Sequence, residues 1–223
     1  MSSVDAVMDR VRAGRRVHDV EALDELARLS GGRVRVRVVQ RLPGGAPARV
    51  EVTFDLVTAI SRQPGDPPEA AHATPTLVLD LTGAYPIEQP AFELRCPMPL
   101  FLPAVAGLRE MSAAVAAAFG RPAPDLPEPV GLPKKICLLR SDGWRPLEMD
   151  LEFLVRQAWR VLTLCPQHLN ALNDRMNWAA AEYWAHHQAE WTLPLAPPLP
   201  EPPPQARCRT PGAPGAFVLE DAP

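Results

Sequence analysis

The N-terminal part of the chain joins a helical pattern to a strictly alternating one. Residues 4–29 carry apolar positions at helical spacing, as one helix or as two pieces separated near Gly14, and Gly31 ends the pattern. Residues 33–39 alternate arginine with valine, which predicts a half-buried strand with its arginines in solvent. The chain therefore begins with a helix followed by an amphipathic strand.

Three more strands are predicted before the alternation ends at Pro97. They cover residues 49–60, 76–82 and 91–96. A Pro-Gly-Gly turn at 43–45 joins the first two strands into a hairpin, and a polar, proline-rich loop at 64–75 precedes the third. Four successive strands preceded by a helix predict an α+β fold, with an antiparallel meander and helices packed on it.

The second half of the chain has helical periodicity and proline-rich connections. Helices are predicted at residues 107–119, 148–165 and 174–187, with a proline-rich loop at 120–135. Ten prolines among residues 194–223 predict a tail that is disordered or extended and packs no core.

Charge and hydropathy exclude several classes of function. With 23 basic and 26 acidic side chains, the formal net charge is -3, which gives no bulk attraction to nucleic acid or to an anionic membrane. The sequence has no apolar run of about 18 residues and no secretory signal at its start. We therefore expect a cytoplasmic protein that binds neither nucleic acid nor membrane.

The four cysteines form no C-x-x-C pair, so neither a structural zinc site nor a disulfide framework is indicated, and no metal or cofactor is expected. Cys165 continues the apolar stripe of its predicted helix and Cys96 ends a strand, so both are interpreted as core residues. Cys208 lies in the tail. Cys137 lies between a loop and a turn, where an incoming protein could reach it.

Cys137 has two interpretations. Four basic residues surround it in the sequence and would favour a thiolate if they are also close in space: Lys134, Lys135, Arg140 and Arg145. An isolated cysteine, however, is more often a small packed residue that ends a short strand.

Three motifs in a fixed order favour the nucleophile. They are Tyr85-Pro86-x-x-Gln89-Pro90 before a strand, then Ile136-Cys137-Leu138 with Gly143-Trp144-Arg145-Pro146 before an apolar helix, then Leu162-x-Leu164, a polar loop and Ala180-x-x-Tyr183. Their order and spacing across residues 17–187 resemble the ubiquitin-conjugating enzyme superfamily.

This resemblance implies a ubiquitin-conjugating-type fold with three regions. Residues 1–16 would be an N-terminal helical extension, residues 17–193 the catalytic domain with an insertion at 106–135, and residues 194–223 the tail. Cys137 would accept a ubiquitin-like protein from an activating enzyme as a thioester and transfer it to a lysine of a target protein. Because a thioester is already activated, the transfer needs a deprotonated amine and a stabilised oxyanion, but no catalytic triad.

The sequence departs from the family beside the cysteine. Where the family has His-Pro-Asn, residues 102–105 read Leu-Pro-Ala-Val, and the insertion separates them from Cys137. These departures resemble the divergent conjugating enzymes of bacterial ubiquitin-like operons, several of which act in antiphage defence.

Residues that support the reaction are therefore expected in the loop after the long helix. The candidates are His168, Asn170, Asn173 and Asp174. The alternatives are helix N-capping for Asn173 or Asp174, and an exposed loop histidine for His168.

The resemblance also implies that the activating enzyme grips the first helix. Four arginines there offer either a docking face for an acidic partner or a solvated helix face: Arg10, Arg12, Arg15 and Arg16.

Other functions remain open. A catalytically inactive module could bind a ubiquitin-like protein as an adaptor, which the missing asparagine favours and the retained Cys137 opposes. A cysteine peptidase or transferase would need an orienting histidine, but no histidine after Cys137 stands in a nucleophile signature. The tail itself could be a polyproline II ligand.

Overall fold

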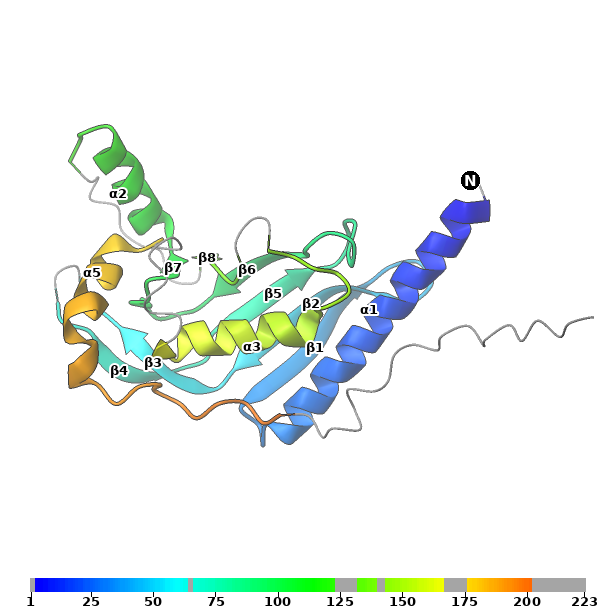
Figure 1. Cartoon of the computed structure of the whole chain (residues 1–223), viewed down its shortest axis with the longest axis horizontal. Coiled ribbons are helices and arrows are strands. Elements are labelled where there is room, and N and C mark those ends of the chain that lie inside the picture. The colour runs from blue at the N-terminus through cyan, green and yellow to red at the C-terminus, as the bar shows by residue number, and fades with distance from the viewer. Residues whose placement is uncertain (1–2, 64–65, 123–131, 140–142, 167–175, 202–223) are drawn as a thin grey trace, which may run out of the picture.

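In the computed structural model, the described residues are 3–63, 66–122, 132–139, 143–166 and 176–201. Helix α1 (Ser3–Leu29) precedes a four-stranded antiparallel sheet in the order β1-β2-β5-β6 (Figure 1). Its strands are β1 (Val34–Arg41), β2 (Pro47–Phe54), β5 (Thr76–Asp80) and β6 (Ala91–Arg95). The predicted α+β class, with an N-terminal helix and a four-stranded antiparallel sheet, is confirmed.

Helix α1 is continuous through Gly14, so the chain forms one helix here and not two pieces. A glycine inside a helix costs about 1 kcal/mol relative to alanine and does not by itself end the helix. The buried side chains of Leu23 and Leu26 attach the later turns to the core. Arg16 is also buried, and its guanidinium donates to the backbone carbonyl of Gly83 at 3.3 Å. The helix thus runs without interruption across residue 16, where the helical extension was expected to end.

The two faces of the sheet follow the predicted alternation. Val52 pairs with Val36 on one side and with Leu77 on the other, and these side chains face the core. Helix α3 (Leu151–Leu162) lies over this face, and α1 packs against both β1 and α3 (Figure 1). On the opposite face, Arg37 of β1 pairs with Glu51 of β2 at 2.5 Å, in agreement with the predicted solvent-exposed arginines of this strand.

Strands β3 (Leu56–Ile60) and β4 (Glu69–Ala73) form a second, two-stranded sheet. The prediction of one strand over 49–60 and of a loop over 64–75 was therefore wrong. The chain turns at Asp55, whose N–H donates to the carbonyl of Arg33 at 2.8 Å, and β3 leaves the main sheet. The sequence of β4, Glu-Ala-Ala-His-Ala, shows no alternation of apolar and polar residues. This segment is a strand because its backbone pairs with β3.

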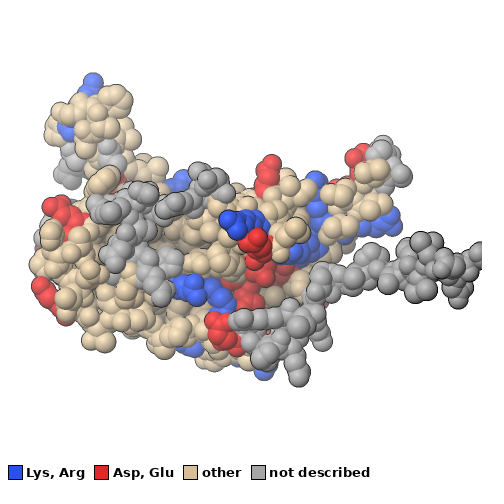
Figure 2. Space-filling view, viewed as in Figure 1, with Lys and Arg blue, Asp and Glu red and all other residues tan. Residues whose placement is uncertain are grey.

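The helices of the second half are shorter than predicted. They are α2 (Leu108–Ala118), α3 and α5 (Trp178–His187), followed by the 3-10 turn η1 (Gln188–Glu190). Helix α3 begins at Leu151 because Asp150 caps it, accepting from the N–H of Phe153 at 2.7 Å. Helix α2 projects from the body as a separate lobe (Figure 1, Figure 2). Among the described helices, none has the length and apolarity to cross a membrane.

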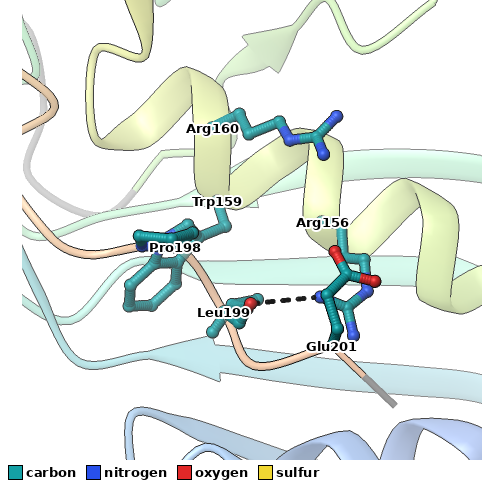
Figure 3. Close-up of a pocket in the computed structure, with 6 residues that line it drawn as sticks. All are labelled: Arg156, Trp159, Arg160, Pro198, Leu199 and Glu201. Carbon is teal, nitrogen blue, oxygen red and sulfur yellow. Dashed lines mark hydrogen bonds between the residues drawn. The ribbon is translucent and has the colours of Figure 1, made fainter. Parts of the chain in front are cut away.

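Residues 194–201, termed the strap, pack on the folded domain, so the prediction that the tail packs no core was wrong for this segment. Leu199 is buried, and the indole N–H of Trp159 donates to the carbonyl of Pro197 at 3.1 Å. Arg156 donates to the carbonyl of Leu199 at 3.4 Å (Figure 3) and to that of Pro200 at 2.7 Å. Prolines lack N–H donors, but the carbonyls of an extended proline-rich segment remain available as acceptors. The rest of the tail, 202–223, lies outside the described residues.

Candidate active site around Cys137

Two short strands close the base of the predicted insertion. Strand β7 (Val105–Ala106) pairs antiparallel with β8 (Lys135–Ile136), so that Val105 lies opposite Ile136. The N–H of Cys137 then donates to the carbonyl of Ala104 at 2.8 Å. Although 31 positions separate Val105 from its partner Ile136 in the sequence numbering, the ladder makes the two segments neighbours. The Leu-Pro-Ala-Val segment at residues 102–105 therefore lies beside the cysteine.

The thiol of Cys137 is partly exposed and is positioned by its neighbours. Ile136 and Leu138 are both buried, so they anchor the backbone on either side of the cysteine. The Sγ atom lies 3.6 Å from the carbonyl oxygen of Leu139 and donates to it. The side chain also touches the core, so both interpretations of Cys137 have a structural basis. Partial exposure distinguishes it from Cys96, which is 2% exposed.

The segment before α5 attaches to the residue next to Ala104. The carbonyl of Pro103 accepts from the N–H groups of Met176 at 2.9 Å and Asn177 at 3.0 Å. Two successive carbonyls, those of Pro103 and Ala104, therefore hold the beginning of α5 and Cys137 respectively. The residues that immediately precede α5 are thus placed close to the cysteine.

The other end of this loop begins at an unusual backbone conformation. Leu164 has φ 56, in the left-handed region that glycine usually occupies after a helix. The N–H of Cys165 bonds to the carbonyl of Arg160 at 2.9 Å and that of Leu164 to the carbonyl of Val161 at 3.2 Å, which closes the last turn of α3. A non-glycine residue in the left-handed conformation costs on the order of 1 kcal/mol of stability. Burial of the Leu164 side chain in the core offsets this cost. The direction in which the chain leaves α3 is therefore well defined.

The four predicted supporting residues, His168, Asn170, Asn173 and Asp174, lie outside the described residues. Sequence reasoning missed Asn177, which is buried and forms the N-cap of α5. Its side-chain oxygen accepts from the N–H of Ala180 at 3.1 Å. The expected start of this helix at 174 is thus corrected to Trp178. The signal was present in the sequence, because asparagine before an apolar helix is a strong N-cap residue.

The basic residues around Cys137 are not equivalent. Lys134 is buried, its backbone pairs with Leu94 of β6, and burial lowers the pKa of its ammonium group. Arg145 is exposed and pairs with Glu148 at 3.2 Å. Lys135 is an exposed residue of β8, and Arg140 lies outside the described residues. Lys134 and Arg145 thus have charged neighbours other than the thiol, while Lys135 lies exposed two residues before Cys137.

The first two sequence motifs meet in space. The indole N–H of Trp144 donates to the carbonyl of Pro86 at 2.9 Å, and the rings of Tyr85 and Trp144 have centroids 6.1 Å apart. The buried hydroxyl of Tyr85 donates to the carboxylate of Asp19 on α1. Arg15 binds the same carboxylate at 2.7 Å.

This network connects α1, the Tyr-Pro turn and the start of α3. Arg15 also reaches the carbonyl of Met149, just before α3, at 3.1 Å. Burial raises the pKa of the Asp19 carboxyl above its usual value, although the hydrogen bonds from Tyr85 and Arg15 oppose that shift. Burial, followed by the charge of Asp19, raises the pKa of Tyr85, so its hydroxyl stays protonated and keeps donating.

Comparisons with known proteins give no relative: no family model, no curated protein and no solved structure matches this chain. The geometry around Cys137 and the sequence motifs are therefore the basis for the functional argument.

Alkylation should separate the cysteines by accessibility. Brief treatment of the native protein with iodoacetamide is expected to label Cys137 at least tenfold faster than Cys96. Burial shields the Cys96 thiol and raises its pKa, and only the thiolate reacts. Peptide mass spectrometry after quenching measures both rates, and labelling in denaturant provides the control in which they converge. Equal rates in the native protein would contradict the assignment of Cys96 to the core.

Proposed function

We propose that this chain is a ubiquitin-conjugating-type transferase whose nucleophile is Cys137. One observation carries the proposal: the carbonyls of Ala104 and Pro103 bind the N–H of Cys137 and the N–H groups that precede α5. This geometry supports a shared site for the cysteine and the loop at 168–174, which the motifs predict. The contact of Trp144 with Pro86 supports the proposal further, because it joins two motifs that are distant in the sequence.

The proposed reaction has two acyl transfers. The Cys137 thiolate attacks the thioester between the activating enzyme and the C-terminal carbonyl of a ubiquitin-like protein, and the thiol of the activating enzyme leaves. A target lysine amine then attacks the Cys137 thioester, an amide forms, and the Cys137 thiolate is released while the amine loses its proton. Both steps pass through an oxyanion that needs hydrogen-bond donors. We propose that donors from the loop at 168–174, with Asn170 and Asn173 foremost, take this role.

The proposed partners are a ubiquitin-like protein, an activating enzyme and a target protein, in a bacterial antiphage conjugation pathway. Fewer than the four expected arginines of α1 are available to form a docking face for the activating enzyme. Arg15 is bound to Asp19, and Arg16 is buried against backbone carbonyls. Arg12 is half-buried and pairs with Asp9 at 3.8 Å, whereas Arg10 is exposed on α1 beside the exposed apolar residues Val7 and Val11.

Reconstitution tests the proposal directly. Incubating the chain with its ubiquitin-like protein, the activating enzyme and ATP should give an adduct that survives non-reducing electrophoresis and disappears with reductant. Absence of such an adduct, while the activating enzyme itself is loaded, would refute the transferase.

Asn177 offers a separate test of the loop. Asn177→Ala removes the N-cap of α5, which should cost about 1 kcal/mol of stability and loosen the end of the loop. Discharge of the thioester to free lysine should slow several-fold while loading is nearly unchanged, because loading precedes amine positioning. Asn177→Ser keeps a capping oxygen and should restore discharge. If both variants discharge at the wild-type rate, the loop does not assist transfer.

A second candidate function is an inactive adaptor that binds a ubiquitin-like protein without carrying it. Ala104, where the family has asparagine, favours this alternative, as does the contact of Cys137 with the core. Binding of the ubiquitin-like protein without any adduct would support it.

A further inference from the structure

Helix α2 is held at its ends and has no buried side chain among those described. At its start, the carboxylate of Glu110 accepts from the N–H of Gly107 at 2.8 Å. At its end, Gly120 takes the left-handed conformation, and the N–H of Arg121 bonds to the carbonyl of Ala116 at 2.8 Å. Local caps therefore maintain the helix without burial of its apolar face.

The unburied face of α2 is apolar and forms a shallow groove. Leu108, Met111, Val115 and Phe119 follow one another at helical spacing, and Phe119 is 75% exposed. The groove continues over Ala116, Arg121 and Pro122. Figure 2 shows α2 as a lobe that stands clear of the body, with an uncharged surface interrupted by basic side chains. Exposed apolar groups arranged in this way are typical of a binding surface.

Among the described residues beside the groove, the charges not already paired within α2 are basic. Glu110 is the single acidic residue of α2, and its carboxylate is occupied by Gly107 and by Arg109, the latter at 3.0 Å. Arg121 lines the groove and is exposed, and Lys135 is exposed on β8 at the base of the lobe. A partner with acidic side chains next to apolar ones would complement this surface.

Neither a second copy nor a membrane fits as well. In a symmetric dimer through this face, the basic Arg121 and Lys135 of one copy would approach the same basic residues of the other, and like charges across an interface are unfavourable. A membrane-binding helix would be expected to carry a cluster of roughly four to eight basic residues, and α2 carries only Arg109.

We propose that the apolar face of α2 binds an acidic amphipathic helix of a protein partner. The binding mode is that of a helix laid against an apolar groove, with Arg121 opposite its carboxylates. Because β7 and β8 join α2 to the segment that ends at Cys137, the bound partner would be delivered next to the thiol. The inference goes beyond the proposed transferase and does not require it.

A synthetic peptide tests the surface without any conjugation chemistry. The probe is a helical peptide of about 14 residues with leucines at i, i+3, i+4 and i+7 and glutamates on its other face. Fluorescence anisotropy with the full chain is expected to show saturable binding of this peptide. Its affinity should be at least tenfold higher than that of a peptide in which lysines replace the glutamates. Val115→Asp should weaken binding tenfold or more, and Arg121→Glu should reverse the preference between the two peptides. Leu147→Asp is the matched control, because Leu147 is an apolar residue 97% exposed outside the groove, and it should bind normally.

Several results would overturn the proposal. These are equal binding of the two peptides, no saturation with the glutamate peptide up to about 1 mM, and equal weakening by Leu147→Asp. Dimerisation that Val115→Asp abolishes would assign the face to a second copy. Val115-dependent binding to phosphatidylglycerol vesicles, without peptide binding, would assign it to a membrane. The peptide result stands whether or not Cys137 forms a thioester, so failure of either proposal can be recognised separately.

Discussion

Cys137→Ala is expected to abolish the reductant-sensitive adduct with the ubiquitin-like protein, a loss of at least 100-fold in the amount of adduct. The sulfur atom is the proposed acceptor of the acyl group, and alanine offers no nucleophile. The backbone hydrogen bond from residue 137 to Ala104 does not depend on the side chain, and the thiol is partly exposed. The fold should therefore persist, so that loss of the adduct on a non-reducing gel reflects loss of the nucleophile and not unfolding of the variant.

Cys137→Ser distinguishes a nucleophile from a nearby binding residue. Serine in the same place should give an oxyester, which forms slowly and resists reductant. Cys165→Ala is the matched control for the loss of a half-buried thiol and should load as the wild type does. An adduct of unchanged intensity in Cys137→Ala would place the acceptor elsewhere, and an unchanged melting temperature of the variants would exclude unfolding as the cause.

Removal of the strap is expected to destabilise the protein by about 2–4 kcal/mol. Truncation after residue 193 exposes the site of Leu199, whose burial contributes about 2 kcal/mol. It also removes the carbonyl partners of Trp159 and Arg156, each worth about 1 kcal/mol net. At 2–4 °C per kcal/mol for a domain of this size, the midpoint of thermal unfolding should fall by roughly 5–15 °C.

Truncation after residue 201 is the matched control, because it keeps the strap and removes only the segment beyond it. Its unfolding midpoint in urea should equal that of the full chain. Trp159→Phe keeps an aromatic ring beside Phe54 but lacks the indole donor, so it should lose about 1 kcal/mol. If truncations after 193 and 201 unfold at the same urea concentration, the strap contributes nothing to stability.

The two-residue periodicity predicted the main sheet well, because its strands have one buried and one solvated face. The arginine-valine alternation of residues 33–39 places the valines toward the core in β1. β4 had no such pattern, since its identity as a strand comes from pairing with β3 and not from its own side chains. The same limitation applies to the strap, whose proline content predicts an extended segment but not the donors that bind it.

The candidate site was only partly accessible to sequence reasoning. The flanks of Cys137 indicated a nucleophile, and the structure leaves its thiol partly exposed between buried neighbours. Proximity along the chain suggested that Lys134 and Arg145 would surround the thiol. Instead Lys134, which lies just before β8 and bridges to Leu94, is buried, and Arg145 pairs with Glu148. Side-chain direction in a strand, set by register, decided this difference.

The resemblance of its motifs singled out Cys137 as the candidate nucleophile, and local pattern by itself determined the α+β class, the first helix and the main strands. These features depend on residues near one another in sequence, and side-chain periodicity records them. Only the tertiary structure decided that Ala104 lies beside Cys137, that Pro103 holds the beginning of α5, and that the strap packs on α3. Each of these contacts has a backbone carbonyl as acceptor and joins positions far apart in the chain. Backbone carbonyls are alike at every residue, so local pattern does not indicate which of them will accept a given donor.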